Sequence, residues 1–152
     1  MADLVYSFVV MNLQLHRDQI KSITRADHEI LSHGVASFRK LFKGERSLRA
    51  DHEFANIYRL LNERIAQHLT YEDKDVFPVL LASRLNAETD GLIANLKQEH
   101  AALRDELHNV NTLLGQRGLN QLTSKISLAL LNFFNHLQDH VDKEDRLLAG
   151  LR

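Results

Sequence analysis

The chain has 152 residues, of which 44% are hydrophobic and 26% charged, enough for one domain with a full core. Its 19 Lys and Arg nearly balance its 20 Asp and Glu, which excludes the strongly basic surface of a nucleic-acid-binding protein. The absence of cysteine excludes disulfides, thiolate-held iron–sulfur clusters and thiol catalysis. Six glycines and one proline are too few for the many turns of an all-β fold.

The beginning of the chain is apolar but does not resemble a membrane segment. The stretch Leu4–Met11 is interrupted by Ser7, is preceded by Asp3, and is shorter than the ~18–20 apolar residues that span a bilayer. We therefore expect a cytoplasmic protein with no membrane partner. We interpret residues 1–17 as an N-terminal arm that packs on the domain or on a second subunit, and residues 18–152 as the domain. The oligomeric state stays open.

Apolar residues recur at spacings of three and four along four segments, which is typical of amphipathic helices. Pro78 is expected to end or kink the second helix, and Thr89 and Asp90 to cap the third. Short links between long helices favour an all-α, antiparallel up-down-up-down four-helix bundle. The four predicted helices cover about residues 18–42, 51–78, 89–115 and 121–148.

Six polar residues interrupt these apolar stripes, with one imidazole on each predicted helix. They are His28, His68, Glu72, His100, His140 and Glu144. A buried polar group without a partner costs ~1–3 kcal/mol and an ionised carboxylate far more, against a total stability of ~5–15 kcal/mol. A metal ion compensates this cost because imidazole and carboxylate are ligands for iron, zinc and manganese.

The spacing of these residues repeats along the chain. The interval from His28 to His68 equals the interval from His100 to His140, and both intervals end in His-x-x-x-Glu followed by Asp. The chain thus contains two helical hairpins of matching spacing that each provide His, His and Glu. Two such half-sites that face each other predict a two-metal centre with bridging carboxylates.

Some assignments stay open at this stage. His136, one turn before His140, and His52, in a segment that repeats the residues around His28, could each provide a fifth imidazole. Asp145 competes with Glu144, which we prefer because a spacing of four keeps it on the stripe. No His-Glu-x-x-His and no Glu-x-x-His occurs, which excludes the zincin motif and that of ferritin-like di-iron bundles.

At these residues the sequence resembles the hemerythrin-like family, in its HHE cation-binding group, over about residues 18–150. The motifs that carry the resemblance are Asp27-His28, His68 with Glu72-Asp73 and Phe77-Pro78, Glu99-His100, and His140 with Glu144-Asp145. The resemblance implies a bundle that holds two non-haem iron ions, bridged by two carboxylates and an oxo or hydroxo group. It also implies binding or sensing of O2 or NO, iron handling, or the repair of iron–sulfur centres.

One position departs from the pattern of the oxygen carriers in this family. They have His-x-x-x-His on the third helix, whereas Leu96 and Arg104 stand four residues either side of His100. We therefore expect a di-iron protein that binds or senses O2 or NO or handles iron, with simple oxygen carriage disfavoured. The alternatives are a di-iron enzyme that reduces NO or peroxide, a stress-related repair protein, and a structural bundle whose site has decayed.

Overall fold

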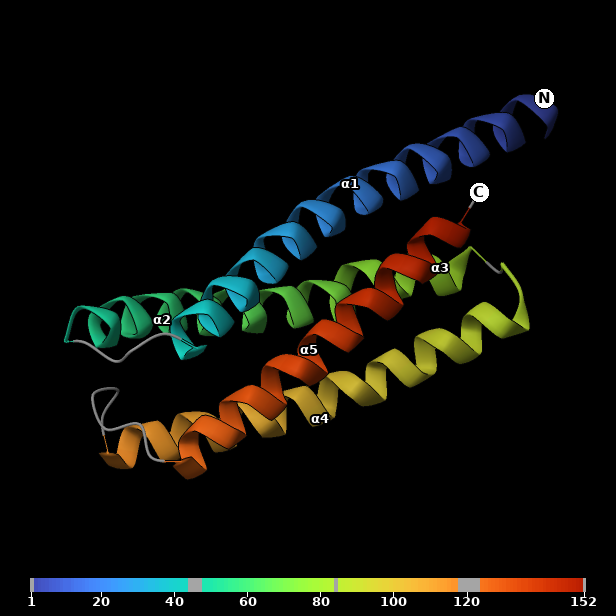
Figure 1. Cartoon of the computed structure of the whole chain (residues 1–152). Coiled ribbons are helices and arrows are strands. Elements are labelled where there is room, and N and C mark those ends of the chain that lie inside the picture. Colours follow the sequence, from blue (N-terminus) through green and yellow to red (C-terminus); the bar gives the residue numbers. More distant parts are fainter. Residues whose placement is uncertain (1, 44–47, 84, 118–123, 152) are drawn as a thin grey trace.

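The computed structural model is helical along almost all of the chain that it describes, which confirms the predicted all-α helical bundle (Figure 1). It describes the backbone of residues 2–43, 48–83, 85–117 and 124–151, without the side chains of 2–15, 41–42, 48–52 and 117. The long helices are α1 (Ala2–Lys43), α2 (Leu48–Tyr71), α4 (Ala87–Arg117) and α5 (Ser124–Gly150). A π-helix, η1 (Glu72–Val76), and the short α3 (Phe77–Ala82) prolong α2.

The four long helices follow one another back and forth along the molecule. In Figure 1, α1 and α4 run from right to left, and α2 and α5 return from left to right. Helix α1 contacts α2 and α5, and α4 packs along α5. The predicted arm, residues 1–17, lies within α1 from Ala2 onward, so the first helix is longer than its apolar pattern indicated. Whether this segment covers the domain or a second subunit stays a prediction.

The second helix changes its winding just before its proline. The backbone N–H of Phe77 donates to the carbonyl oxygen of Glu72, five residues back, which is the hydrogen bond of a π-helix. Pro78 then lies in the first turn of α3, where its missing N–H costs little. The helical path therefore continues through the proline to Ala82, and the wider turn begins at a predicted site residue, Glu72.

Helix α4 begins earlier than expected. The side-chain oxygen of Asn86 accepts a hydrogen bond from the backbone N–H of Thr89 at 2.8 Å, so Asn86 caps the helix. The prediction that Thr89 and Asp90 form the cap was wrong. Both lie inside the first turn, where the carboxylate of Asp90 faces the positive end of the helix dipole.

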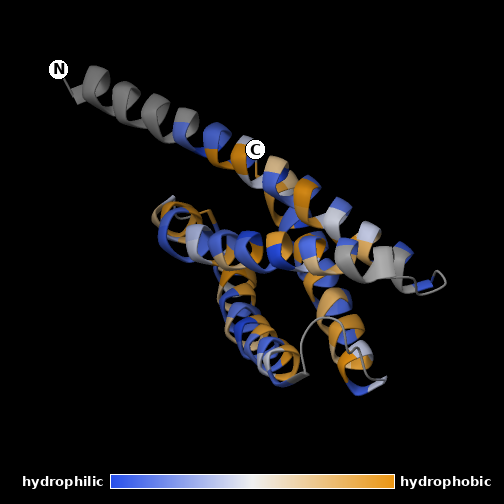
Figure 2. Cartoon of the chain, turned by 90° about the vertical axis from the view of Figure 1, so that its left-hand side faces the viewer, coloured by the Kyte–Doolittle hydropathy of each residue, from blue (hydrophilic) through white to orange (hydrophobic). Residues whose placement is uncertain are grey.

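Buried apolar side chains form two clusters along the bundle. One takes residues from all four long helices, among them Leu31, Ile65, Leu103 and Leu137. The other gathers around Phe77 at the opposite side of the predicted site and includes Ile20, Val76, Leu80, Ile93, Leu96, Leu147, Leu148 and Leu151. Figure 2 shows apolar and polar residues alternating around the helices, as amphipathic helices require.

A glycine allows α1 and α2 to approach each other closely. A Cβ atom added to Gly34 would lie 2.3 Å from a methyl carbon of Leu61, far inside contact distance. Leu61 is itself buried in the first apolar cluster. The glycine within a helix, which costs ~1 kcal/mol in helix propensity, thus makes room for a core side chain.

Candidate metal centre

All six predicted site residues lie in the band between the two apolar clusters and are almost fully buried. Their exposed fractions are between 0% and 2%. His28 comes from α1, His68 from α2 and His100 from α4, while His140 and Glu144 lie one turn apart on α5. The apolar spacing brings each of them inward, because residues three and four apart share a helix face.

The six side chains form two overlapping groups that could each hold a metal ion. One group contains His28 and His68 and the other His100 and His140. Both groups share Glu72 and Glu144, and within each group the possible ligand atoms lie within 4.8 Å of one another. We call these groups the His28/His68 half and the His100/His140 half.

Each glutamate reaches both halves. The Oε2 atom of Glu144 lies 3.1 Å from Nε2 of His28, while its Oε1 atom lies 2.8 Å from Nε2 of His140. Glu72 contacts His28 through Oε1 at 3.7 Å, and its Oε2 atom lies 3.5 Å from His68 and 3.3 Å from His100. Carboxylates that reach both halves suit the bridging of two ions.

A carboxylate from outside the six residues faces the other nitrogen, Nδ1, of every imidazole. The distances are 2.7 Å from His28 to Asp145, 2.9 Å from His100 to Asp73 and 2.9 Å from His140 to Glu99. The fourth distance, from His68 to Asp27, is 3.3 Å, and this contact falls short of hydrogen-bond geometry. Such carboxylates fix the tautomer and orientation of metal-binding histidines.

These contacts orient the imidazoles for metal binding. A carboxylate is only an acceptor, so Nδ1 of His28, His100 and His140 carries a proton, and Nε2 is the atom that can bind an ion once any proton on it has left. The Nε2 atoms of His100 and His140 lie 2.9 Å apart. Two nitrogens that bind one ion at ~2.1 Å and at a right angle are about 3 Å apart. The residues present therefore fit a metal ion on geometric grounds.

When no ion is bound, protons on the imidazoles supply the positive charge that balances the buried glutamates. Burial lowers the pKa of His28, but hydrogen bonds to Glu144, Glu72 and Asp145 outweigh it and raise the pKa to about 10. The pKa values of His68 and His100 rise to about 9, because the facing carboxylates likewise outweigh burial. Burial raises the pKa of Glu144, but hydrogen bonds from the four imidazoles hold it well below its usual range.

The remaining candidates of the sequence lie elsewhere. His136 is half-buried and contacts Glu106 at 2.9 Å, away from both groups. The side chain of His52 lies outside the described residues. Between the two acidic candidates on α5, Glu144 belongs to both groups, whereas Asp145 contacts His28 from the outside.

The outer carboxylates are the part of the site that sequence reasoning missed. Each is adjacent in sequence to one of the six inner residues: Asp27 to His28, Asp73 to Glu72, Glu99 to His100 and Asp145 to Glu144. The sequence does show an acidic residue next to an inner residue four times. It does not show which imidazole each carboxylate contacts, because that imidazole lies on another segment of the chain.

A bundle of helices around a buried band of four imidazoles and two shared carboxylates defines a helical metal-binding protein. The chain matches the family model of the hemerythrin HHE cation binding domain over residues 19–151, nearly its whole length. The chain therefore belongs to the hemerythrin HHE cation-binding family. Searches of curated proteins and of solved structures gave no significant match. Among the described residues, no helix is both long and apolar enough to cross a membrane.

Proposed function

We propose that this protein holds a pair of non-haem iron ions and uses it to bind or sense a small diatomic ligand, O2 or NO. His28 and His68 hold one ion, His100 and His140 hold the other, and Glu72 and Glu144 bridge the two. The supporting observation is that Glu72 and Glu144 belong to both groups of possible ligands. Two carboxylates shared between two pairs of imidazoles are the arrangement expected when each pair of imidazoles holds its own ion.

The donor set supports iron. Imidazole and carboxylate together are the ligands of non-haem Fe2+ in sites that keep open coordination positions. When bound, the two ions would supply electrons and an open position for a small ligand. The place four residues before His100 is taken by Leu96 and the place four residues after it by Arg104, so α4 contributes one imidazole. The open position belongs in this region.

The surroundings of the site favour a small, uncharged ligand. Ile65, Leu103, Phe133 and Leu137 belong to the cluster beside the six site residues and are at most 1% exposed. Such a lining keeps bulk water out and admits an apolar diatomic molecule more readily than an ion. These side chains thus exclude water from the centre while the carboxylates balance its charge.

Iron content and a ligand titration test the proposal. Protein loaded with Fe2+ without oxygen should contain two iron ions per chain. Mixing with O2 or NO should change the absorption spectrum, and the change should reverse on degassing. Glu63→Gln, on the exposed face of α2, is the matched control for Glu72→Gln, which should lose both the iron and the spectral change. Less than one iron per chain in the parent protein would contradict the proposal.

The alternative is a di-iron enzyme that reduces NO or peroxide, favoured by the same single imidazole on α4. Stopped-flow mixing of the reduced protein with several equivalents of NO or peroxide separates the two functions. Binding or sensing predicts uptake of one ligand per site and no further consumption. An enzyme instead consumes many equivalents per chain while an added reductant is oxidised.

A further inference from the structure

The two halves of the centre differ in how firmly their outer contacts are held. In the His100/His140 half, Asp73 and Glu99 both lie 2.9 Å from an imidazole nitrogen. Each of these carboxylates also pairs with a cation: Asp73 with Arg104 at 2.6 Å, and Glu99 with Lys143 at 2.5 Å. Carboxylates held from both sides keep their imidazoles in one orientation.

The His28/His68 half is held less firmly. Asp27 pairs with Arg64 but lies 3.3 Å from His68, outside hydrogen-bond geometry. The side chain of Asp145 is 48% exposed, against 16–25% for the three other outer carboxylates. Within the described part of the chain, Asp145 is also the one outer carboxylate with no Lys or Arg at ion-pair distance.

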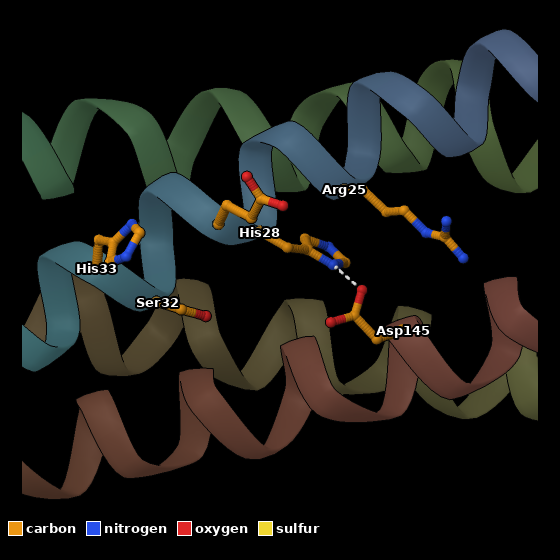
Figure 3. Close-up of a pocket in the computed structure, with 6 residues that line it drawn as sticks. Arg25, His28, Ser32, His33 and Asp145 are labelled. Carbon is orange, nitrogen blue, oxygen red and sulfur yellow. Dashed lines mark hydrogen bonds and ion pairs between the residues drawn. The ribbon is translucent and has the colours of Figure 1, made fainter.

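A surface cavity of about 410 Å³ opens at this contact (Figure 3). The figure shows the imidazole of His28 hydrogen-bonded to Asp145 at the cavity, with Arg25, Ser32 and His33 around it. His28, one of the six inner residues, lines this cavity. None of the six lines any other cavity described.

We propose that the Asp145–His28 pair is the exchange gate of the metal centre. The ion of the His28/His68 half enters and leaves through this cavity, and the ion of the other half exchanges slowly. This proposal rests on the proposed metal pair. Asp145 acts as a positioning residue that holds His28 inward.

The physical reason lies in what each imidazole must displace in order to release its ion. Besides leaving the ion and the shared glutamates, His28 has to break its hydrogen bond to the exposed carboxylate of Asp145 and can then turn into the cavity. His100 would have to leave Asp73, which Arg104 holds, and would also push against the ring of Phe77, whose centroid lies 5.2 Å away. The first movement separates His28 from the ring of His68, 5.0 Å away within the centre, whereas the second disturbs the apolar core around Phe77.

Chelator-driven release of iron tests the gate. Protein is loaded with Fe2+ without oxygen, its iron per chain is counted, and it is mixed with an excess of a chromogenic Fe2+ chelator. We expect one ion to leave at least tenfold faster than the other. Asp145→Ala should speed the fast phase at least tenfold more. Asp105→Ala, at an exposed position of α4, is the control and should alter the fast phase less than twofold.

A variant that fills the cavity tests the route itself. Ser32→Phe should slow the fast phase at least fivefold with the iron count unchanged. If its circular dichroism shows that it does not fold, His33→Trp at an exposed position on the cavity replaces it. Release of two ions in one phase, or a filled cavity that leaves the fast phase unchanged, would overturn the gate alone. A parent protein that binds less than one iron would contradict the metal pair and the gate with it.

Discussion

Asp73 and Asp145, at equivalent places in the two hairpins, each hold an imidazole that belongs to the other half of the chain. Asp73, which directly follows η1's first residue, contacts Nδ1 of His100 on α4, and Asp145 on α5 contacts Nδ1 of His28 on α1. The repeat seen in the sequence is therefore also a repeat in space. Each hairpin orients one imidazole of its partner, so the site is complete only when the two hairpins dock.

The shared carboxylates predict that one substitution removes both ions. In Glu144→Gln, the amide loses the charge and half of the acceptor capacity that faces the four imidazoles. We expect the iron content to fall from two ions per chain to less than one, as measured by elemental analysis after anaerobic loading. Loss of just one ion would show that Glu144 serves a single half.

The pKa shifts predict how the stability of the metal-free protein depends on pH. The pKa values of His28, His68 and His100 are above 6.5, so their stabilisation is complete below pH 6.5 and is lost as pH rises through about 9–10. The pKa of Glu144 lies below 4.5, so its stabilisation is present above pH 4.5 and is lost as pH falls further. The free energy of unfolding in urea with a chelator should be highest between these limits, at pH 4.5–6.5.

Glu144→Gln provides the control for this pH profile. Hydrogen bonds to Glu144 are the largest contribution that raises the pKa values of His28 and His100. The variant should therefore lose less stability between pH 6.5 and 10 than the parent. A parent protein whose free energy of unfolding increases over that range would contradict the assigned protonation.

Metal loading at pH 7 should release protons. With pKa values of about 9–10, His28, His68 and His100 are protonated in the metal-free protein, and an ion can bind their Nε2 atoms only after the proton leaves. An indicator dye in weakly buffered solution should record up to three protons per loaded chain, one for each of these imidazoles. The release should decline towards pH 10, and iron binding without it at pH 7 would argue against these contacts.

The six inner residues of the site could be predicted from the sequence because they follow the same spacing of three and four as the apolar residues of the helices. His28 and Glu144 stand on apolar stripes at spacings of three and four, and a residue on the stripe of an amphipathic helix faces the core. The same argument correctly favoured Glu144 over Asp145 as the inward side chain. The amphipathic period thus determines which residues are buried without any knowledge of how the helices pack.

The other features of the fold and the site could not be predicted in this way. The outer contacts and the close approach of α1 and α2 depend on how the helices pack, which the apolar period of a single helix does not determine. That Asp27 faces His68 and not its neighbour His28 follows from the packing of α1 against α2. The π-helix before Pro78 was missed because a single proline predicts a kink but not the winding that precedes it. Gly34 makes room for the side chain of Leu61 on the facing helix, a contact that the period of one helix cannot predict.

The contact between Gly34 and Leu61 predicts a change of sign in a double-mutant cycle. Alanine at position 34 gains ~1 kcal/mol of helix propensity, but forcing the buried Leu61 to move costs ~1–3 kcal/mol. Gly34→Ala should therefore destabilise the parent protein by about 1 kcal/mol and stabilise the Leu61→Ala variant by up to about 1 kcal/mol. Urea unfolding measures both, and Gly115→Ala, with open space around its Cβ, is the control. Equal effects in the two backgrounds would exclude the contact.

The neighbours of His136 predict that it does not bind the ions. Its Nδ1 atom contacts Glu106 at 2.9 Å, its side chain is 29% exposed, and it belongs to neither group of possible ligands. His136→Ala should therefore keep two iron ions per chain and the spectrum of the parent, whereas His140→Ala, one turn away, should lose iron. His52→Ala in the same series tests the other candidate imidazole by the same iron count. Loss of iron in His136→Ala would add a fifth imidazole to the site and close the open position that ligand binding requires.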